Sequence, residues 1–310
     1  MGEILTGSQR EMIKRSTLPK VLLFLAAFVF FSANTIYLLE ADPTHFNTAL
    51  DKCYHFDFEH VRKGPQLNLK SALLLNYENG QVLYARNPDE IRPIASLSKL
   101  VTAMVIIDKG LDFDTVVTIT REDAKRSSRS RLRVGYQLTV RDLMHAMLLN
   151  SDNRAARALA EATSGSIESF AAEMNRKVKK LGLENTVFYE PSGLDDGNVS
   201  TAHEIAKILH YAYDYEIIRK ITSKKTYMVR VLNRKNTRLQ MANTNLLIHS
   251  SYTVLSGKTG YIKASDYCLT ALVRNKKGER LTVVVLGVPG DRLRFKEARR
   301  LIDWGFKQII

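Results

Sequence analysis

Residues 92–100 read Arg-Pro-Ile-Ala-Ser-Leu-Ser-Lys-Leu and open an apolar segment that predicts a helix as far as about Ile107. One face of this helix carries Leu97, Leu100, Val101, Met104 and Val105. Ser96 and Lys99 stand three residues apart on another face, which brings the amine near the hydroxyl. Burial would favour the neutral amine, and a neutral amine can activate a serine as a nucleophile. The pair alone is a weak signal, because a helix-capping serine followed by a solvated lysine gives the same pattern.

Two further motifs follow in the order that a single active site requires. Ser151-Asp152-Asn153 lies at the break between an apolar run and an alanine-rich helix, and Lys258-Thr259-Gly260 precedes Tyr261 in a strand-like segment. The first motif comes 55 residues after Ser96, and the second follows 107 residues later. Each has an ordinary explanation, a helix cap or a polar strand edge. Their joint occurrence at a helix start, a helix break and a strand favours one catalytic site.

Beyond residue 69, both ends of the chain predict strands. Residues 72–75 and 82–86 flank Asn79-Gly80, a pair that favours a hairpin with a type I′ turn. Residues 269–287 read as a second hairpin, and residues 291–308 carry helical spacing. We therefore expect an antiparallel sheet to which both chain ends contribute.

The middle of the chain, from residue 96 to about residue 215, reads mainly as helices. Thr139 and Thr201 each precede an acidic residue by three positions, Asp142 and Glu204, and resemble capping boxes. A further helical stripe is formed by Phe170, Met174, Val178 and Leu181. The prediction is one discontinuous α+β domain with a helical insertion between its strands.

The N-terminus has the features of an exported protein. Residues 21–39 are almost entirely apolar, and a run of about 20 such residues can span a bilayer. Basic residues within residues 1–20 place the N-terminus in the cytoplasm. We expect a transmembrane anchor or a cleaved signal peptide at residues 21–39, a linker at residues 40–68 and the catalytic domain at residues 69–310. Either alternative at residues 21–39 exports that domain from the cytoplasm.

The chain is strongly basic, with 46 Lys and Arg against 32 Asp and Glu and a net charge of +14. Such an excess favours polyanionic surroundings: nucleic acid, anionic lipid or an acidic polymer. Export makes nucleic acid a poor expectation. The stretch from residue 121 to residue 141 includes Arg126, Arg129, Arg131 and Arg133. We expect it to contact anionic wall polymer or the membrane surface.

The sequence predicts neither a metal site nor a cofactor. His203-Glu204 begins like a zinc-peptidase helix, but Lys207 stands where the second histidine belongs. Cys53 and Cys268 could pair in an oxidising compartment, although Cys268 lies in an apolar strand-like run and fits as a core residue. Their pairing stays open.

The chain resembles the D-alanyl-D-alanine carboxypeptidases of the low-molecular-mass penicillin-binding proteins, and within them the D-alanyl-D-alanine endopeptidase branch most. The three motifs are the signature that these proteins share with class A β-lactamases. The other matching stretches are residues 130–135, 190–194 and 243–247. The resemblance covers roughly residues 70–308 and implies a β-lactamase/transpeptidase-like fold. It also implies that peptidoglycan is the substrate and that β-lactams bind.

The resemblance implies a catalytic role for four residues. Ser96 would attack the D-Ala carbonyl and form an acyl-enzyme, with Lys99 as its base. Ser151 would relay a proton to the leaving amine, and Asn153 would hold Lys99 and the substrate amide.

It also implies a substrate-binding role for the strand motif. Lys258 and Thr259 would bind the carboxylate of substrate or penicillin, and Gly260 would let the substrate backbone approach the strand. The backbone N–H groups of Ser96 and Tyr261 would form the oxyanion hole.

Three functions stay open at this point. Members of the family commonly carry a second, all-β domain, whereas only 52 residues follow Lys258. This feature resembles the endopeptidase branch, so we expect cross-link cleavage, terminal D-Ala removal, or both. A class A-like β-lactamase would need a carboxylate base, for which Glu190 is the candidate. A non-catalytic wall-binding protein is the third alternative, although such relatives usually lose the nucleophile or its lysine.

Overall fold

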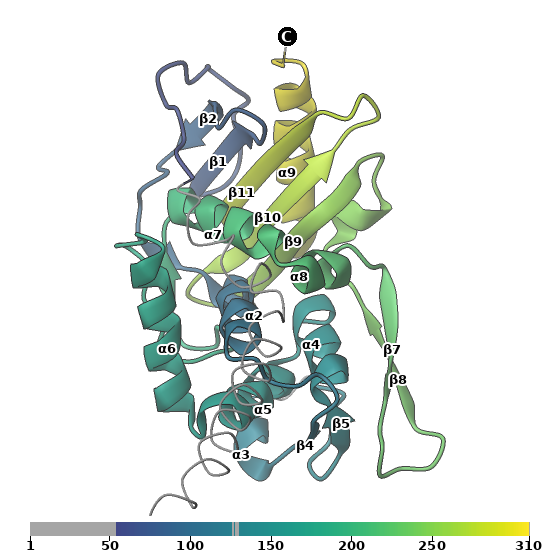
Figure 1. Cartoon of the computed structure of the whole chain (residues 1–310). Helices are drawn as coiled ribbons and strands as arrows, with labels where there is room; N and C mark the ends of the chain where they lie inside the picture. The colour runs from purple at the N-terminus through teal and green to yellow at the C-terminus, as the bar shows by residue number, and fades with distance from the viewer. Residues whose placement is uncertain (1–53, 126, 128–129, 310) are drawn as a thin grey trace, which may run out of the picture. The chain divides into compact units, whose positions relative to one another are not determined.

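The computed structural model describes residues 54–125, 127 and 130–309, and a five-stranded antiparallel sheet forms its centre (Figure 1). The strand order is β2-β1-β11-β10-β9, so the two chain ends meet where β1 pairs with β11. The strands are β1 Ser71–Asn76, β2 Val82–Arg86, β9 Thr253–Ile262, β10 Asp266–Arg274 and β11 Arg280–Val288. The predicted sheet built from both chain ends is confirmed.

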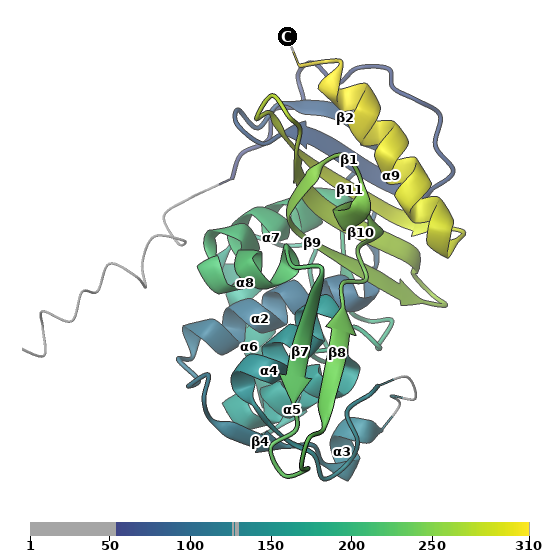
Figure 2. The same ribbon diagram turned by 90° about the vertical axis from the view of Figure 1, so that its right-hand side faces the viewer.

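Helices cover both faces of the sheet, which explains why its central strand is apolar almost throughout. α7 (Ala202–Asp214) contacts β1, β10 and β11 on one face, and α9 (Asp291–Phe306) contacts these strands on the other (Figure 2). All residues of β11 from Leu281 to Val288 are buried. A strand covered on both faces loses the polar alternation of a half-exposed strand.

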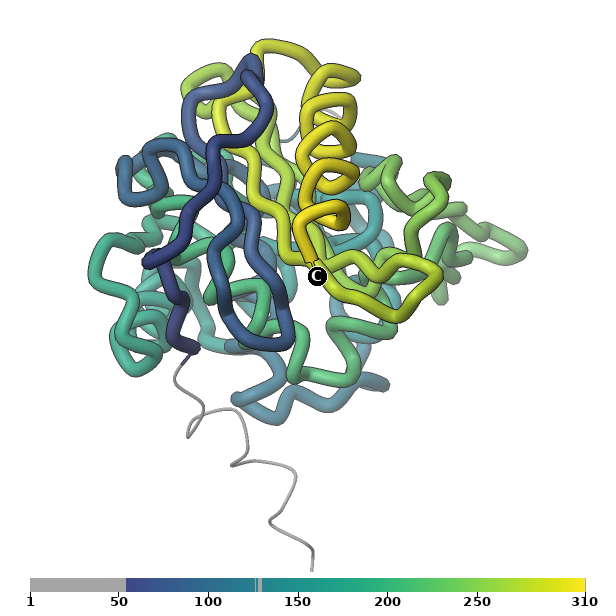
Figure 3. Tube along the Cα trace, turned by 90° about the horizontal axis from the view of Figure 1, so that it is seen from above, coloured from purple at the N-terminus to yellow at the C-terminus, as the bar shows by residue number. Residues whose placement is uncertain are grey.

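The first hairpin and the last helix lie side by side, as Figure 3 shows from above. The rings of Tyr84 in β2 and Trp304 in α9 meet edge to face, with centroids 6.2 Å apart. Arg62 donates a hydrogen bond of 2.9 Å to the side chain of Gln308, 246 positions later in the chain. The sheet therefore joins the beginning and the end of the described chain into one core.

The helical part is built around α2 (Lys99–Asp108). All its residues from Lys99 to Ile106 are buried, because α4, α5, α6 and α7 pack around it. A helix that is covered on all sides needs an apolar surface all round. The neighbouring elements are β3 Arg92–Pro93, η2 Ala95–Ser98, β4 Val116–Thr118, α3 Arg121–Ala124, β5 Gln137–Thr139, α4 Val140–Leu149, α5 Asn153–Ser164, α6 Ile167–Lys180, β6 Val199–Ser200 and α8 Glu216–Thr222. A further 3-10 turn, η3 (Leu246–His249), precedes β9.

Helices begin at both predicted capping threonines. Thr139 and Thr201 accept the backbone N–H of Asp142 and Glu204 at the starts of α4 and α7. The two acids bond elsewhere: Asp142 accepts the N–H of Arg230, and Glu204 accepts the N–H of Asn185. The acids therefore tie each helix start to a distant loop or strand. The predicted stripe in α6 is buried as well.

The first hairpin turns differently from the sequence prediction. A type I′ turn needs positive φ at both central residues. Gly80 has φ of 73°, but Asn79 does not have a positive φ. The N–H of Gly80 instead bonds to the carbonyl of Asn76, and the side chain of Asn79 accepts the N–H of Gln81. The turn is therefore longer than two residues.

The described part of the predicted linker, residues 54–68, packs against the domain. The ring of Tyr54 lies 4.9 Å from that of His210, and the N–H of Val82 bonds to the carbonyl of Asp57. The predictions for residues 1–53, the tail and the anchor or signal peptide included, lie outside the described residues. Within the described part, no helix has the length and apolar character that a membrane crossing requires.

A further hairpin, formed by β7 (Thr226–Arg230) and β8 (Arg238–Ala242) and not predicted from the sequence, extends along α4 (Figure 2). Val229 and Met241 are buried, whereas Met228 and Arg230 are exposed on the opposite face. The hairpin therefore has one packed face and one face toward solvent.

Candidate active site

Ser96 lies in η2, where α2 meets strand β9. Ala95, just before it, has a left-handed backbone with φ of 48°. Gly260 of β9 comes so close that an added Cβ would lie 3.0 Å from the Ser96 nitrogen and 2.9 Å from the carbonyl oxygen of Ile94. Glycine at position 260 therefore lets the segment that carries Ser96 sit directly against β9. The sequence predicted that Gly260 leaves room for the substrate backbone. The structure adds the segment of residues 94–96 as a second close neighbour of this glycine.

Lys99 is fully buried in the first turn of α2, with its amine facing Ser96. Lys99 Nζ lies 2.8 Å from Ser96 Oγ and 2.7 Å from Asn153 Oδ1, and it also donates to the carbonyl of Ser192. Burial lowers the pKa of Lys99 from 10.5 to about 8, although the carboxylates of Glu190 and Asp152 act in the opposite direction. Desolvation disfavours the charged amine, so the neutral form becomes accessible near physiological pH.

The Ser192 carbonyl beside this amine is fixed by a buried carboxylate. Glu190 accepts the N–H of Ser192 at 2.8 Å and the N–H of Leu194 at 2.7 Å, and it also accepts the N–H of Gly193. Ser96 Oγ donates to the Ser192 carbonyl at 3.3 Å. Glu190 therefore shapes the loop that contacts both Ser96 and Lys99.

The motif Ser151-Asp152-Asn153 places two polar side chains on either side of a helix start. Ser151 has a left-handed backbone with φ of 57°, and Asp152 caps α5 by accepting the N–H groups of Arg154 and Ala155. The central aspartate is thus structural. Its position turns Asn153 toward Lys99 while Ser151 faces β9.

Lys258 approaches the site from the sheet side. Its side chain is buried, and Nζ lies 2.8 Å from Ser151 Oγ and 3.0 Å from the Thr259 carbonyl. Burial, together with the positive charges of Lys99 and Arg294, holds the pKa of Lys258 well below its usual 10.5. Each of two buried lysines therefore faces one serine hydroxyl.

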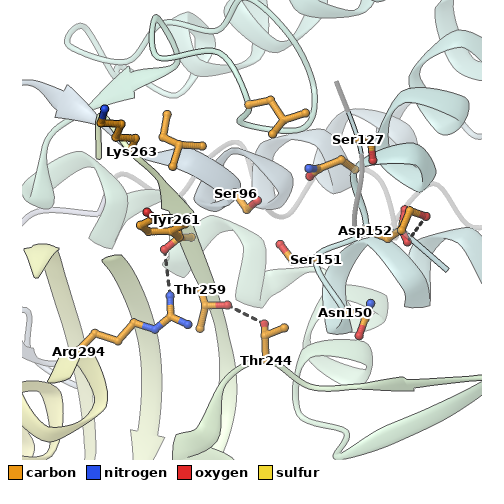
Figure 4. A pocket seen from close by; sticks show the side chains of 15 residues that line it. Ser96, Ser127, Asn150, Ser151, Asp152, Thr244, Thr259, Tyr261, Lys263 and Arg294 are labelled. Atoms are coloured by element: carbon orange, nitrogen blue, oxygen red, sulfur yellow. Dashed lines mark hydrogen bonds between the residues drawn. The ribbon is translucent and has the colours of Figure 1, made fainter. Parts of the chain in front are cut away.

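These groups border a cavity of about 550 Å³ between the helical part and β9 (Figure 4). Six predicted site residues line it: Ser96, Ser151, Asn153, Thr259, Gly260 and Tyr261. Lys99 and Lys258 do not line the cavity themselves, but their amines form hydrogen bonds with Ser96 and Ser151, which do. The structure thus brings together all eight residues that the sequence predicted.

The D-alanyl-D-alanine carboxypeptidase family, peptidase S11, matches residues 59–290. The chain belongs to this family. It is 34% identical over 245 residues to the D-alanyl-D-alanine endopeptidase of Escherichia coli K12, a match that covers 77% of this chain and 78% of that protein. The corresponding endopeptidase of Pseudomonas aeruginosa is 37% identical, with 76% of each chain covered.

Other relatives carry related activities. A D-alanyl-D-alanine carboxypeptidase of Bacillus subtilis is 35% identical over 77% of this chain and 62% of its own length. The crystal structure of the Streptomyces K15 DD-transpeptidase is 27% identical and has a TM-score of 0.74, covering 79% of this chain and all of that one. The fold of this S11 peptidase is therefore the DD-transpeptidase fold.

Arg294 and Thr244 are among the cavity-lining residues of this S11 peptidase to which the sequence assigned no role. Arg294 of α9 is buried and donates to the carbonyl of Gly260 at 3.0 Å. Thr244 Oγ1 lies 2.6 Å from Thr259 Oγ1. The stretch around Thr244 contributed to the family resemblance, but an arginine near the C-terminus has no sequence signal of its own.

Other predicted features of this S11 peptidase lie away from the cavity. Cys268 is a buried free thiol, and the prediction about Cys53 falls outside the described residues. His203 pairs with Asp89 at 3.1 Å. The described residues bring Asp57, Glu59 and His60 together, but all three are exposed.

Proposed function

We propose that this enzyme cleaves D-alanyl peptide bonds through an acyl-enzyme on Ser96, with Lys99 as the base. As a member of its family, the protein is a serine-type D-alanyl-D-alanine peptidase that acts on peptidoglycan. The observation that carries the assignment of roles is the Lys99 amine, buried 2.8 Å from Ser96 Oγ with a pKa of about 8. About a tenth of such an amine is neutral at pH 7 and able to accept a proton.

The acylation step follows from this geometry. Ser96 Oγ bonds to the D-Ala carbonyl carbon while its proton passes to Lys99 Nζ. The backbone N–H groups of Ser96 and Tyr261 stabilise the oxyanion. The C–N bond then breaks, and the leaving amine takes the hydroxyl proton of Ser151, which is replaced by the proton that Lys99 accepted. Lys258 lies beside that hydroxyl, and water later releases the acyl group from Ser96.

Substrate recognition rests on the sheet side of the cavity. The amine of Lys258 and the hydroxyl of Thr259 donate to the carboxylate of the substrate or a β-lactam, and the negative charge of that carboxylate favours the protonated amine. Thr244 pairs with Thr259 and orients its hydroxyl. Arg294 adds a second positive charge on the same wall.

Both cross-link cleavage and terminal D-Ala removal belong to the proposal. Relatives named endopeptidase and carboxypeptidase match the chain at similar identity. Digestion of purified muropeptides, followed by mass spectrometry, compares the two activities. Monomers formed from cross-linked dimers indicate endopeptidase activity, and loss of one alanine from pentapeptide monomers indicates carboxypeptidase activity.

A β-lactamase is disfavoured by the position of Glu190. That enzyme class needs a free carboxylate to activate the deacylating water, whereas Glu190 is buried and its oxygens accept the loop N–H groups of residues 192–194. Nitrocefin separates the two functions. A stoichiometric, long-lived adduct supports the peptidase, and rapid multiple turnover contradicts it.

The location is proposed from the sequence. Residues 21–39 would anchor the enzyme in the cytoplasmic membrane or be cleaved as a signal peptide, with the catalytic domain in the periplasm. Fractionation of cells and mass spectrometry of the mature N-terminus distinguish an anchored from a cleaved form. Recovery of the full-length chain in the cytosolic fraction would contradict both.

Replacing the nucleophile tests the whole assignment. Ser96→Ala removes the hydroxyl that bonds to the acyl group, so both labelling by fluorescent penicillin and muropeptide cleavage should disappear. Circular dichroism and the melting temperature, unchanged from the wild type, provide the folding control. Covalent labelling that persists in Ser96→Ala would overturn the role of this serine.

A further inference from the structure

The segment that contains the β7–β8 hairpin has an unusual charge pattern. Residues 217–265 include ten Lys and Arg and no Asp or Glu. Four of these cations lie at the end of the β7–β8 hairpin: Arg230, Arg234, Lys235 and Arg238. All four are exposed, and within the described residues none of them forms an ion pair. The hairpin end therefore carries an unneutralised positive charge.

The strand register makes this arrangement costly for the hairpin itself. Arg230 of β7 and Arg238 of β8 are directly opposite partners on the exposed face. Like charges in such a cross-strand pair destabilise a hairpin. Asp142 contacts this region, but it is buried and accepts the backbone N–H of Arg230 rather than its guanidinium. An anionic ligand would offset the repulsion.

The four cations also surround a hollow. A cavity of about 240 Å³ at the hairpin end is lined entirely by residues 230–238, among them all four cations. Asn236, in the connecting turn, has a left-handed backbone with φ of 59°. All four cations thus border one concave site.

The base of the β7–β8 hairpin adjoins the catalytic cavity. Two residues after β8 ends at Ala242, Thr244 lines that cavity and pairs with Thr259. Arg131 donates to the carbonyl of Gln240, which joins the hairpin to the loop that carries Ser130. A polymer that occupies the catalytic cavity therefore lies near the base of the hairpin.

We propose that the hairpin end is a second, non-catalytic binding site for peptidoglycan, where Arg230, Arg234, Lys235 and Arg238 bind carboxylates of stem peptides other than the one being cleaved. The inference rests on the proposed function, because it assumes the same polymer as substrate. The proposed site also differs from the polymer-binding surface predicted from the sequence, which was the basic stretch from residue 121 to residue 141. Arg131 of the basic stretch belongs to this site through the hairpin, whereas Arg126 and Arg129 lie outside the described residues.

Binding by enzyme whose catalytic cavity is already filled isolates the second site. The full chain is first acylated with penicillin and then sedimented with isolated sacculi over a range of salt concentrations. The test variant replaces all four cations, R230Q/R234Q/K235Q/R238Q. The control, R274Q/K276Q/K277Q/K296Q, removes the same charge from exposed positions outside the hairpin.

We expect wild type and control to bind sacculi, and the hairpin variant to bind about tenfold more weakly at low salt. Raising the salt concentration should weaken the wild type toward the level of the variant. Sacculi with amidated carboxylates should bind the wild type as weakly as the variant binds native sacculi. Acylation by penicillin and cleavage of soluble muropeptide dimers should stay within about twofold of wild type, because the four cations lie outside the catalytic cavity.

The outcomes separate the two proposals. An enzyme that neither acylates nor cleaves dimers overturns the proposed function. If it does both while the hairpin variant binds sacculi as the wild type does, or the control loses as much binding, the second site is wrong. If the hairpin variant instead loses binding to anionic phospholipid vesicles but not to sacculi, the surface contacts a membrane and the peptidoglycan site is excluded.

Discussion

Lys99 and Lys258 approach the cavity from opposite sides, and their surroundings differ in charge. Each amine is buried and lies 2.8 Å from a serine hydroxyl. Lys99, on the helical side, has Glu190 and Asp152 as its charged neighbours. Lys258, on the sheet side, has Lys99 and Arg294. The two lysines are therefore equally buried but differ in the charge of their neighbours.

The comparison suggests a division of labour between the two halves of the site. On the helical side, the Lys99 amine donates to three oxygens, those of Ser96, Asn153 and Ser192. These hydrogen bonds hold the amine beside the hydroxyl of the nucleophile. The sheet side concentrates positive charge with the hydroxyl of Thr259, which suits an incoming carboxylate. We infer that Lys99 transfers protons and that Lys258 recognises charge.

The largest effect is expected on the helical side. Lys99→Met removes the base and should slow acylation by penicillin about 10³-fold. Stopped-flow measurement with a fluorescent penicillin gives this rate, and binding before acylation should change little. A variant that acylates at more than a tenth of the wild-type rate would place the base elsewhere.

Lys258→Met should have a smaller effect of another kind. Loss of a charge-assisted hydrogen bond to the substrate carboxylate should weaken substrate use by about 100-fold, mostly through KM. An otherwise identical peptide with an amidated C-terminus should be affected much less. Equal losses on both substrates would mean that Lys258 acts in the chemical step and not in recognition.

The pH dependence sharpens the comparison further. Because the pKa of Lys99 is about 8, its neutral fraction grows as the pH rises toward that value. Acylation should therefore increase about 50-fold between pH 6 and pH 8 and level off above pH 9. In Lys258→Met the midpoint should stay near pH 8, because burial and not Lys258 lowers the pKa of Lys99. A profile that falls across this range would contradict Lys99 as the base.

The smallest effect is expected for a residue that acts through another. Thr244→Val removes the partner of the Thr259 hydroxyl and should raise KM about three- to tenfold, with kcat nearly unchanged. Thr244→Ser keeps the hydroxyl and should restore the wild-type KM. If Thr244→Ser is as impaired as Thr244→Val, the methyl group rather than the hydrogen bond is what matters.

The sequence was sufficient to predict the site residues that belong to motifs and the strands at both chain ends. It was insufficient for groups without a side-chain signal. The Ser192 carbonyl contacts both Ser96 and Lys99, yet a backbone oxygen leaves no trace in the sequence. Arg294 reaches the cavity only because α9 packs against the sheet, a tertiary contact that local patterns do not encode.

Local patterns were also insufficient for two longer segments. In the β7–β8 hairpin few positions are buried, Val229 and Met241 among them, so its alternating pattern is weak. In the predicted linker, proline and charges masked the alternating aromatics Tyr54, Phe56 and Phe58, whose rings pack on histidines of α7. Tertiary packing decided both segments.

The pairing of β1 with β11 has a consequence for how the enzyme folds. Ser71 lies opposite Leu286. One edge of β1 therefore stays unpaired until its partner strand, more than 200 residues later in the chain, has been synthesised. Chains dominated by such distant contacts fold slowly, and an unpaired strand edge is prone to aggregate meanwhile. The nucleophile helix is made early, whereas the wall that carries Lys258 is made late. A nascent or truncated chain would therefore hold its serine without a cavity around it, and acylating activity would begin only when the last strands close the sheet.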